Sequence, residues 1–254
     1  MKNLLFKEWL ISERQTGYLM QTAQQVTSSL KKLYSPNIFN EDVVKQIPHN
    51  FFSDDKFIAW VKKFNPDFVP GTHNMQKCSS EGCALFVGNK YVIKFTKGKD
   101  EANIAYLMIG DKSFPVVDVI YYNNIYLIAM KELNTNFKAV EQEITEATYL
   151  TYQFILDLES ENKDKSKVPV NFNLKEFKNW MAGRPENALT LDFAYQIIKL
   201  MEKVFKKSGY SLGHDWDPNN LGMNQKGKIQ SFDLGRSRTY GVNVKTPEIP
   251  SLEQ

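Results

Sequence analysis

Three oxygen-bearing side chains stand at a suggestive spacing late in the chain. Asp215 is followed five residues later by Asn220, and Asp233 stands thirteen residues after that, at the head of Asp-Leu-Gly. Carboxylate and amide oxygens are the hard ligands that Mg2+ prefers. Because Asp, Asn and Gly are also common turn residues, either motif alone is compatible with an ordinary turn. Their joint occurrence after a strong helical pattern and around a hairpin favours a functional site.

This pattern resembles the protein-kinase-like superfamily, which includes protein kinases and the aminoglycoside and choline phosphotransferases. Its catalytic loop reads Asp-x-x-x-x-Asn and its magnesium loop reads Asp-Phe-Gly or Asp-x-Asp. The resemblance implies that Asp215 is the catalytic base, which takes the proton of an acceptor hydroxyl. It also implies that Asn220 and Asp233 bind Mg2+, and that ATP lies between two lobes.

A lysine upstream fits the same resemblance. Superfamily members carry a phosphate-binding lysine on a strand, and the segment 91–95 reads YVIKF with Lys94 at its fourth place. The resemblance implies that Glu101, on the next helix, pairs with Lys94. The alternatives are a lysine that protects a strand edge and a glutamate that is favoured at the first turn of a helix.

The loop that covers the nucleotide departs from the family pattern. Where a protein kinase has G-x-G-x-x-G, the segment 77–82 reads KCSSEG and keeps only the last glycine. Backbone amides there could still bind phosphate, although an ordinary hairpin turn is equally compatible. The residues that we expect to line this part of the site are Ser79, Ser80, Gly82 and Ala84.

The segment 125–133, IYLIAMKEL, is expected to lead into the hinge between the lobes. The resemblance makes Met130 the gatekeeper-like residue and places the backbone of Lys131, Glu132 and Leu133 against adenine. The alternative is that this segment is an ordinary core strand. A core strand can also lead into the hinge, so the two interpretations are compatible.

Other positions differ from full protein kinases. Gly213 stands where the family often has histidine, His214 where arginine is common, and Asp217 where serine/threonine kinases commonly have lysine. The given sequence ends 21 residues after Asp233, so we expect no Ala-Pro-Glu activation segment and a reduced second lobe.

The elements that must position these residues follow from periodicity. Apolar residues at helical spacing predict three or four short helices in residues 1–70, and further helices at 100–110, 140–158, 174–182 and 189–209. Strands are predicted on either side of Gly88-Asn89 and of Asn123-Asn124, with a hairpin that turns at 225–227. The prolines at 247 and 250 forbid a long final helix.

These elements predict an α+β, bilobal, protein-kinase-like fold. We expect a helical extension at 1–74, a small antiparallel β lobe at 75–133, and a reduced helical lobe at 134–254 that carries the catalytic and metal-binding loops. The 32 basic and 29 acidic residues give a net charge of +3, spread along the chain, so nucleic acid is not indicated. Charged residues near the start of the sequence argue against a signal peptide or membrane span. The spacing of Cys78 and Cys83 indicates neither a zinc site nor a disulfide framework. A cytoplasmic location is therefore expected.

The predicted function is ATP- and Mg2+-dependent transfer of the γ-phosphoryl group to a hydroxyl. An atypical protein serine/threonine kinase is the first expectation, because residues 134–188 lack the acidic cluster expected of an aminoglycoside pocket. A small-molecule kinase and a catalytically inactive pseudokinase, whose N-terminal helices would bind a protein partner, are the alternatives. Nucleotidyl transfer on the same fold is a weaker one.

Overall fold

The computed structural model describes residues 51, 54–70, 73–79, 82–88, 90–161, 173–184, 186–212, 220–234, 237–238 and 244–253. The chain divides into two units, Met1–Asn40 and Glu41–Gln254, and all described residues belong to the second. The helices predicted before residue 50 therefore lie outside the described residues.

A five-stranded antiparallel sheet forms the first part of the described unit. Its strands are β1 (His73–Ser79), β2 (Gly82–Val87), β3 (Tyr91–Thr96), β4 (Val116–Tyr122) and β5 (Ile125–Lys131), in the order β1-β2-β3-β5-β4. Helix α5 (Lys99–Leu107) connects β3 to β4. Strands β2 to β5 and this helix confirm the sequence prediction, whereas β1 was not predicted as a separate strand.

The turns form where their residues favour them. Gly88 has φ of +65°, and Asn123 and Asn124 have φ of 49° and 60°, in the left-handed region that glycine and asparagine tolerate best. These residues join β2 to β3 and β4 to β5, as predicted. Short turns of this kind bring consecutive strands into antiparallel pairs.

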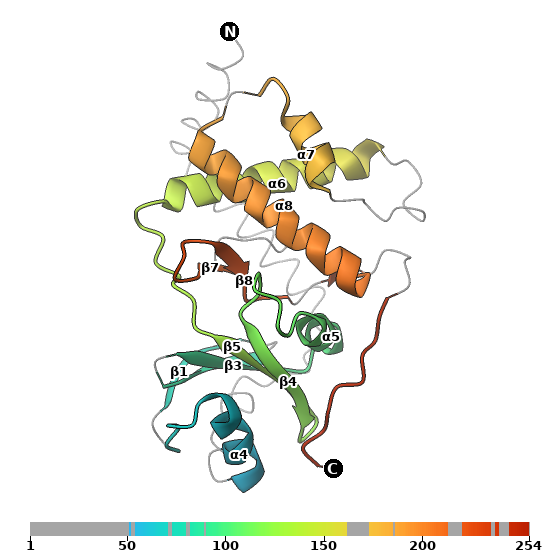
Figure 1. The fold of residues 1–254 in the computed structure, drawn as a ribbon. Coiled ribbons are helices and arrows are strands. Elements are labelled where there is room, and N and C mark those ends of the chain that lie inside the picture. The colour runs from blue at the N-terminus through green and yellow to red at the C-terminus, as the bar shows by residue number, and fades with distance from the viewer. Residues whose placement is uncertain are drawn as a thin grey trace. The chain divides into compact units, whose positions relative to one another are not determined.

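Helix α4 (Asp55–Phe64) packs on one face of the sheet, and α5 and α8 (Ala188–Ser208) lie on the other side (Figure 1). The Phe57 ring of α4 lies 6.3 Å from that of Phe95 on β3. The Trp60 indole N–H donates to Asp118 Oδ2 on β4 at 2.8 Å. Because neighbouring residues of a strand point to opposite faces, Lys94 points away from α4 and toward α5.

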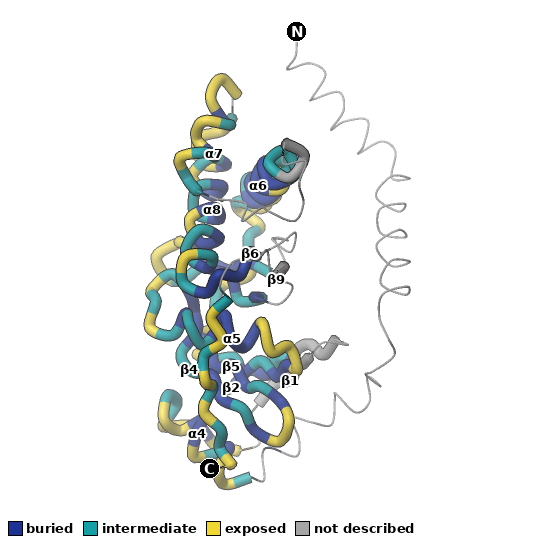
Figure 2. The backbone as a smooth tube through the Cα atoms, turned by 90° about the vertical axis from the view of Figure 1, so that its right-hand side faces the viewer, coloured by how far each residue is buried: buried dark blue, intermediate teal, exposed yellow. Residues whose placement is uncertain are grey.

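The second part of the unit is helical. Helix α6 (Glu141–Glu161) lies beside α8, and α7 (Leu174–Met181) packs on both, with the rings of Phe154 and Phe177 5.1 Å apart. Helix α8 ends as predicted, with lysines in its last turn and Gly209 at φ of +75°. Figure 2 shows buried positions along α8 and through the strands.

Two small strand pairs complete the unit. β6 (Ser211–Leu212) pairs with β9 (Ser237–Arg238), and β7 (Leu221–Met223) pairs with β8 (Ile229–Ser231). The β7–β8 hairpin turns where the sequence predicted it. A small antiparallel sheet followed by helices and short hairpins confirms the α+β fold class.

The cysteines correct one expectation. Cys83 is disulfide-bonded, and Cys78 is its Cα partner in the register of β1 and β2. Residues directly opposite one another on antiparallel strands lie at a spacing that a disulfide can bridge. The sequence did not indicate a disulfide because β1, and hence this register, was not predicted.

Among the described helices, none combines the length and the apolar character that crossing a lipid bilayer requires.

Candidate active site

Lys94 lies in a row of residues on the face of the sheet that is directed toward α5. In the strand register it is opposite Ala84 on β2 and Ile128 on β5, while Val92 is opposite Met130. Cross-strand partners share a face, so Ala84 and Met130 lie on the same face as the lysine. The structure thus brings two of the predicted nucleotide-lining residues, Ala84 and Met130, to that face.

The Lys94 ammonium contacts two carboxylates from distant parts of the chain. Its Nζ lies 2.5 Å from Glu101 Oε1 on α5 and 2.9 Å from Asp233 Oδ1 after β8. The side chains of Lys94 and Glu101 are 19% and 6% exposed, whereas that of Asp233 is 35% exposed. The two predicted partners of the nucleotide phosphates and metal, Lys94 and Asp233, therefore meet directly.

These contacts change the proton affinities. Burial lowers the pKa of Lys94, but the attraction of Glu101 and Asp233 outweighs it, so that the pKa is raised above that of an ordinary lysine. Burial raises the pKa of the Glu101 carboxyl, the attraction of Lys94 offsets this only in part, and the nearby charge of Asp233 raises the pKa further. The lysine therefore stays charged, and Glu101 protonates more readily than an ordinary glutamate.

The short connection between β3 and α5 places Glu101 within reach. Helix α5 begins at Lys99, and the Gly98 amide before it donates to Thr96 Oγ1 at 3.0 Å. This bond turns the chain directly from the strand into the helix. Helix α5 thus begins three residues after the last residue of β3.

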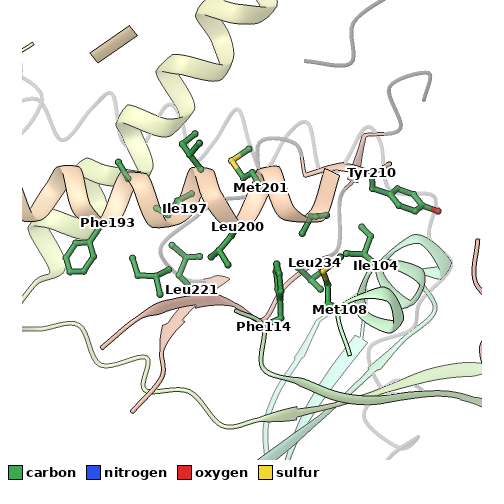
Figure 3. Packing of buried hydrophobic residues seen from close by; sticks show 14 of the residues in the cluster. Ile104, Met108, Phe114, Phe193, Ile197, Leu200, Met201, Tyr210, Leu221 and Leu234 are labelled. Atoms are coloured by element: carbon green, nitrogen blue, oxygen red, sulfur yellow. The ribbon is translucent and has the colours of Figure 1, made fainter. Parts of the chain in front are cut away.

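Asn220 and Asp233 stand at the open end of the β7–β8 hairpin. The Phe232 amide donates to the Asn220 carbonyl at 3.3 Å, and the Ser231 hydroxyl donates to the Asp233 carbonyl at 3.1 Å. Leu234 is buried in the main hydrophobic cluster with Met108 and other residues (Figure 3). The hairpin and this anchor hold Asp233 opposite the sheet.

The oxygens of Asn220 and Asp233 suit Mg2+, a hard cation. Lys94, Glu101 and Asp233 together carry a formal charge of −1 (one positive and two negative), so a polyphosphate would be repelled without a counter-cation. The donor types and the local charge therefore fit a magnesium ion held by Asn220 and Asp233. Within the described part of the chain, no three His, Cys, Asp or Glu side chains gather as a metal site.

The predicted hinge follows β5. Met130 is buried, and the Glu132 amide donates to the Lys90 carbonyl at 2.8 Å. The Leu133 side chain packs closely on Gly222 of β7, where an added Cβ would lie 2.5 Å from Leu133 Cβ. Sequence reasoning missed Gly222, although a glycine inside a short strand is a known sign of close approach.

Not every predicted site residue is among the described residues. Asp215 and Ser80 lie outside the described residues, as do Gly213, His214 and Asp217. Ser79 and Gly82 are register partners at the ends of β1 and β2. The roles assigned to these residues stay predictions.

Comparisons with known proteins add little to this geometry. No protein-family model matches the chain, and no curated protein matches it. Among solved structures, the chain is similar to the GDP and kanamycin complex of APH(2")-IIia, with 10% identity and a TM-score of 0.33 over 72% of this chain and 73% of that chain. It is also similar to the GDP complex of wild-type aminoglycoside 2'-phosphotransferase-IIIa, with 12% identity and a TM-score of 0.35 over 71% and 72% of the two chains. Because these scores are low, the resemblance to the protein-kinase-like superfamily rests on the chain's own order of elements and on the contacts of Lys94 with Glu101 and Asp233.

Proposed function

We propose that this protein is an ATP- and Mg2+-dependent phosphotransferase that moves the γ-phosphoryl group to a hydroxyl. The observation that carries the proposal is the contact of Lys94 Nζ with both Glu101 and Asp233. A strand lysine, a helix glutamate and an aspartate after a hairpin are the groups that phosphoryl transfer on a kinase-like fold requires.

Lys94 would bind the phosphates. An ammonium has three N–H donors, and two of them point to Glu101 and Asp233, which leaves one for a phosphate oxygen. Glu101 would keep the ammonium in place within the cleft. Bound at Asn220 and Asp233, Mg2+ would neutralise charge on the phosphate oxygens.

Asp215 would orient the acceptor hydroxyl and accept its proton. The acceptor oxygen forms a bond to the γ-phosphorus as the bond to the β–γ bridging oxygen breaks, and ADP leaves with that electron pair. Positioning and charge stabilisation supply most of the rate enhancement in such reactions.

The acceptor that we propose is a protein serine or threonine. Residues 134–188 lack the dense acidic cluster that would recognise a polycationic aminoglycoside. A small-molecule hydroxyl is the other acceptor class, and the same assay tests it.

The test is transfer from ATP labelled in the γ-phosphate, with casein-like proteins, kanamycin and the protein itself as acceptors. The proposal expects labelled product that requires Mg2+ and is lost in Asp215→Asn, whereas Asp55→Asn, on α4, retains activity. Label on kanamycin alone would identify a small-molecule kinase. ATP binding without any labelled product would identify a pseudokinase and overturn the proposal.

A further inference from the structure

Tyr210 occupies the junction between the helical part of the unit and the segment that contains Asp215. It follows Gly209 at the end of α8 and directly precedes β6. Its side chain is 1% exposed and lies beside Ile104 of α5 in the buried cluster (Figure 3). The Tyr210 amide donates to Ser208 Oγ at 3.1 Å, which fixes the backbone at this point.

The hydroxyl of this tyrosine bonds twice to α5. It donates to Asp100 Oδ1 at 3.0 Å and accepts from Asn103 Nδ2 at 3.3 Å. Residues three apart share one face of a helix, so both partners face Tyr210. Asp100 directly precedes Glu101 in the first turn of α5.

Contacts at both ends of helix α5 connect it to the C-terminal part of α8 and to Tyr210, which follows α8. Just beyond its C-terminal end, Asp111 Oδ1 and Oδ2 each lie 2.9 Å from a lysine ammonium of α8, those of Lys203 and Lys207 respectively. At its N-terminal end, the connection is the hydroxyl of Tyr210 to Asp100. This second tie is the one next to the glutamate that contacts Lys94.

The position of Glu101 depends on the first turn of α5. Glu101 is 6% exposed, and a buried carboxylate that loses its counter-ion is strongly disfavoured. A small displacement of this turn would separate Glu101 from Lys94 and leave Asp233 as the carboxylate that still contacts the ammonium. A bond that fixes this turn relative to the end of α8 therefore also helps to hold Glu101 against Lys94.

We propose that Tyr210 is a positioning residue for phosphoryl transfer, and that its hydroxyl, through Asp100 and Asn103, holds the first turn of α5 and with it the Lys94–Glu101 pair. This inference rests on the proposed function. The ring of Tyr210 contributes packing, and the positioning role belongs to the hydroxyl alone.

The test compares variants that keep the ring. Tyr210→Phe removes only the hydroxyl, Asp100→Ala removes its acceptor, and Asp100→Asn keeps an acceptor oxygen. Tyr122→Phe is the matched control, because the Tyr122 hydroxyl donates to Asp54 Oδ2 at 2.6 Å and ties α4 to β4 away from Lys94. The measurements are MgADP affinity by calorimetry, kcat and KM for ATP in the labelled-phosphate assay, and thermal stability.

The inference expects Tyr210→Phe and Asp100→Ala to lower kcat/KM on the order of tenfold and to weaken MgADP binding about threefold, the size of effect that one hydrogen bond can supply. Asp100→Asn should recover most of the loss. The double variant Tyr210→Phe with Asp100→Ala should be no worse than either single variant. Tyr122→Phe should lower stability while kcat and KM stay at the wild-type values.

Two failures are distinguishable. Wild-type kinetics and MgADP affinity in Tyr210→Phe would overturn the inference, as would equal losses in Tyr122→Phe. A wild-type protein that transfers no phosphate would overturn the proposed function, and the MgADP affinities would then still decide whether the hydroxyl positions Lys94.

Discussion

At the scale of single residues, the site depends on one ammonium shared by two carboxylates of different character. Glu101 is buried and Asp233 is partly exposed, and both lie within 2.9 Å of Lys94 Nζ. A lysine held from two sides keeps its charge despite burial. Burial also raises the pKa of the Glu101 carboxyl, which still contacts the lysine.

Glu101→Gln should therefore lose activity. Its stability relative to the wild-type protein should increase as the pH rises. A carboxyl with a raised folded pKa stabilises the fold fully below its unfolded pKa of about 4.3 and loses that contribution as the pH rises through the folded value. Glutamine does not titrate, so the free energy of unfolding of the variant relative to wild type should increase from pH 4 to pH 7.

Urea unfolding of both proteins across this pH range measures the difference. Glu141→Gln, on the exposed first turn of α6, is the control for the same substitution at a surface glutamate. A difference for Glu101→Gln that stays constant from pH 4 to pH 7 would show that burial does not raise the pKa of Glu101.

At the scale of elements, β7 and the segment after β5 meet through one glycine. Gly222 allows Leu133 to pack against the β7 backbone, and the Asn134 and Met223 backbones exchange hydrogen bonds of 2.9 Å and 2.8 Å beside it. This contact links the strand that follows Asn220 to the predicted adenine-binding segment.

Gly222→Ala should push these two segments apart. The new Cβ would lie 2.5 Å from Leu133 Cβ, which is part of a rigid position and cannot move as a flexible chain end does. Overpacking of this kind costs about 1 to 3 kcal/mol in the free energy of unfolding. Urea unfolding should show that loss, and ATP affinity should fall with it.

The second variant Leu133→Gly, made in the Gly222→Ala background, removes the opposing Cβ. The double variant should lose less free energy of unfolding than the sum of the losses of the two single variants. Strict additivity of the two changes would mean that the close contact is not the cause.

The elements that form from local signals were predictable. The β2–β3 and β4–β5 hairpins follow from Gly88 and from Asn123-Asn124, and α8 follows from its apolar stripe and Gly209. Pairings between distant segments were not predictable from periodicity. β1, the β6–β9 pair and the disulfide of Cys83 depend on a register that no local pattern contains.

The site itself shows the same division. Lys94 and Asp233 are 139 residues apart in sequence, so no local rule could bring them together, and their pairing was anticipated only through the resemblance to a family. The role of Tyr210 was missed because a buried tyrosine at the end of a helix is indistinguishable in sequence from ordinary core.

At the scale of the whole described unit, the last residues connect the helical part to the outer edge of the sheet. The Lys245 amide donates to the Ser208 carbonyl at 2.9 Å, and the Tyr121 amide of β4 donates to the Pro250 carbonyl at 2.8 Å. The Leu252 amide then donates to the Tyr121 carbonyl at 3.1 Å. The segment runs past the end of α8 to the edge strand β4, which it partly covers (Figure 1).

Leu252→Pro should detach this segment from β4. Proline has no N–H, so the bond to the Tyr121 carbonyl is lost, at a cost of about 1 kcal/mol in the free energy of unfolding. Hydrogen exchange at the Tyr121 amide should become faster. Leu252→Ala keeps the N–H and should leave exchange at Tyr121 unchanged, and equal exchange in both variants would contradict this role for the segment.

Calorimetric titration of ATP, with and without Mg2+, tests the central claim most directly. Wild-type protein should bind ATP, and Mg2+ should tighten the binding. Lys94→Met should weaken it about tenfold or more, because a charge-assisted contact to phosphate is lost, while Lys62→Met on the exposed side of α4 should bind as wild type. The account would be contradicted by an ATP affinity that changes neither with Mg2+ nor on the Lys94→Met substitution, or by a wild-type protein that does not bind ATP.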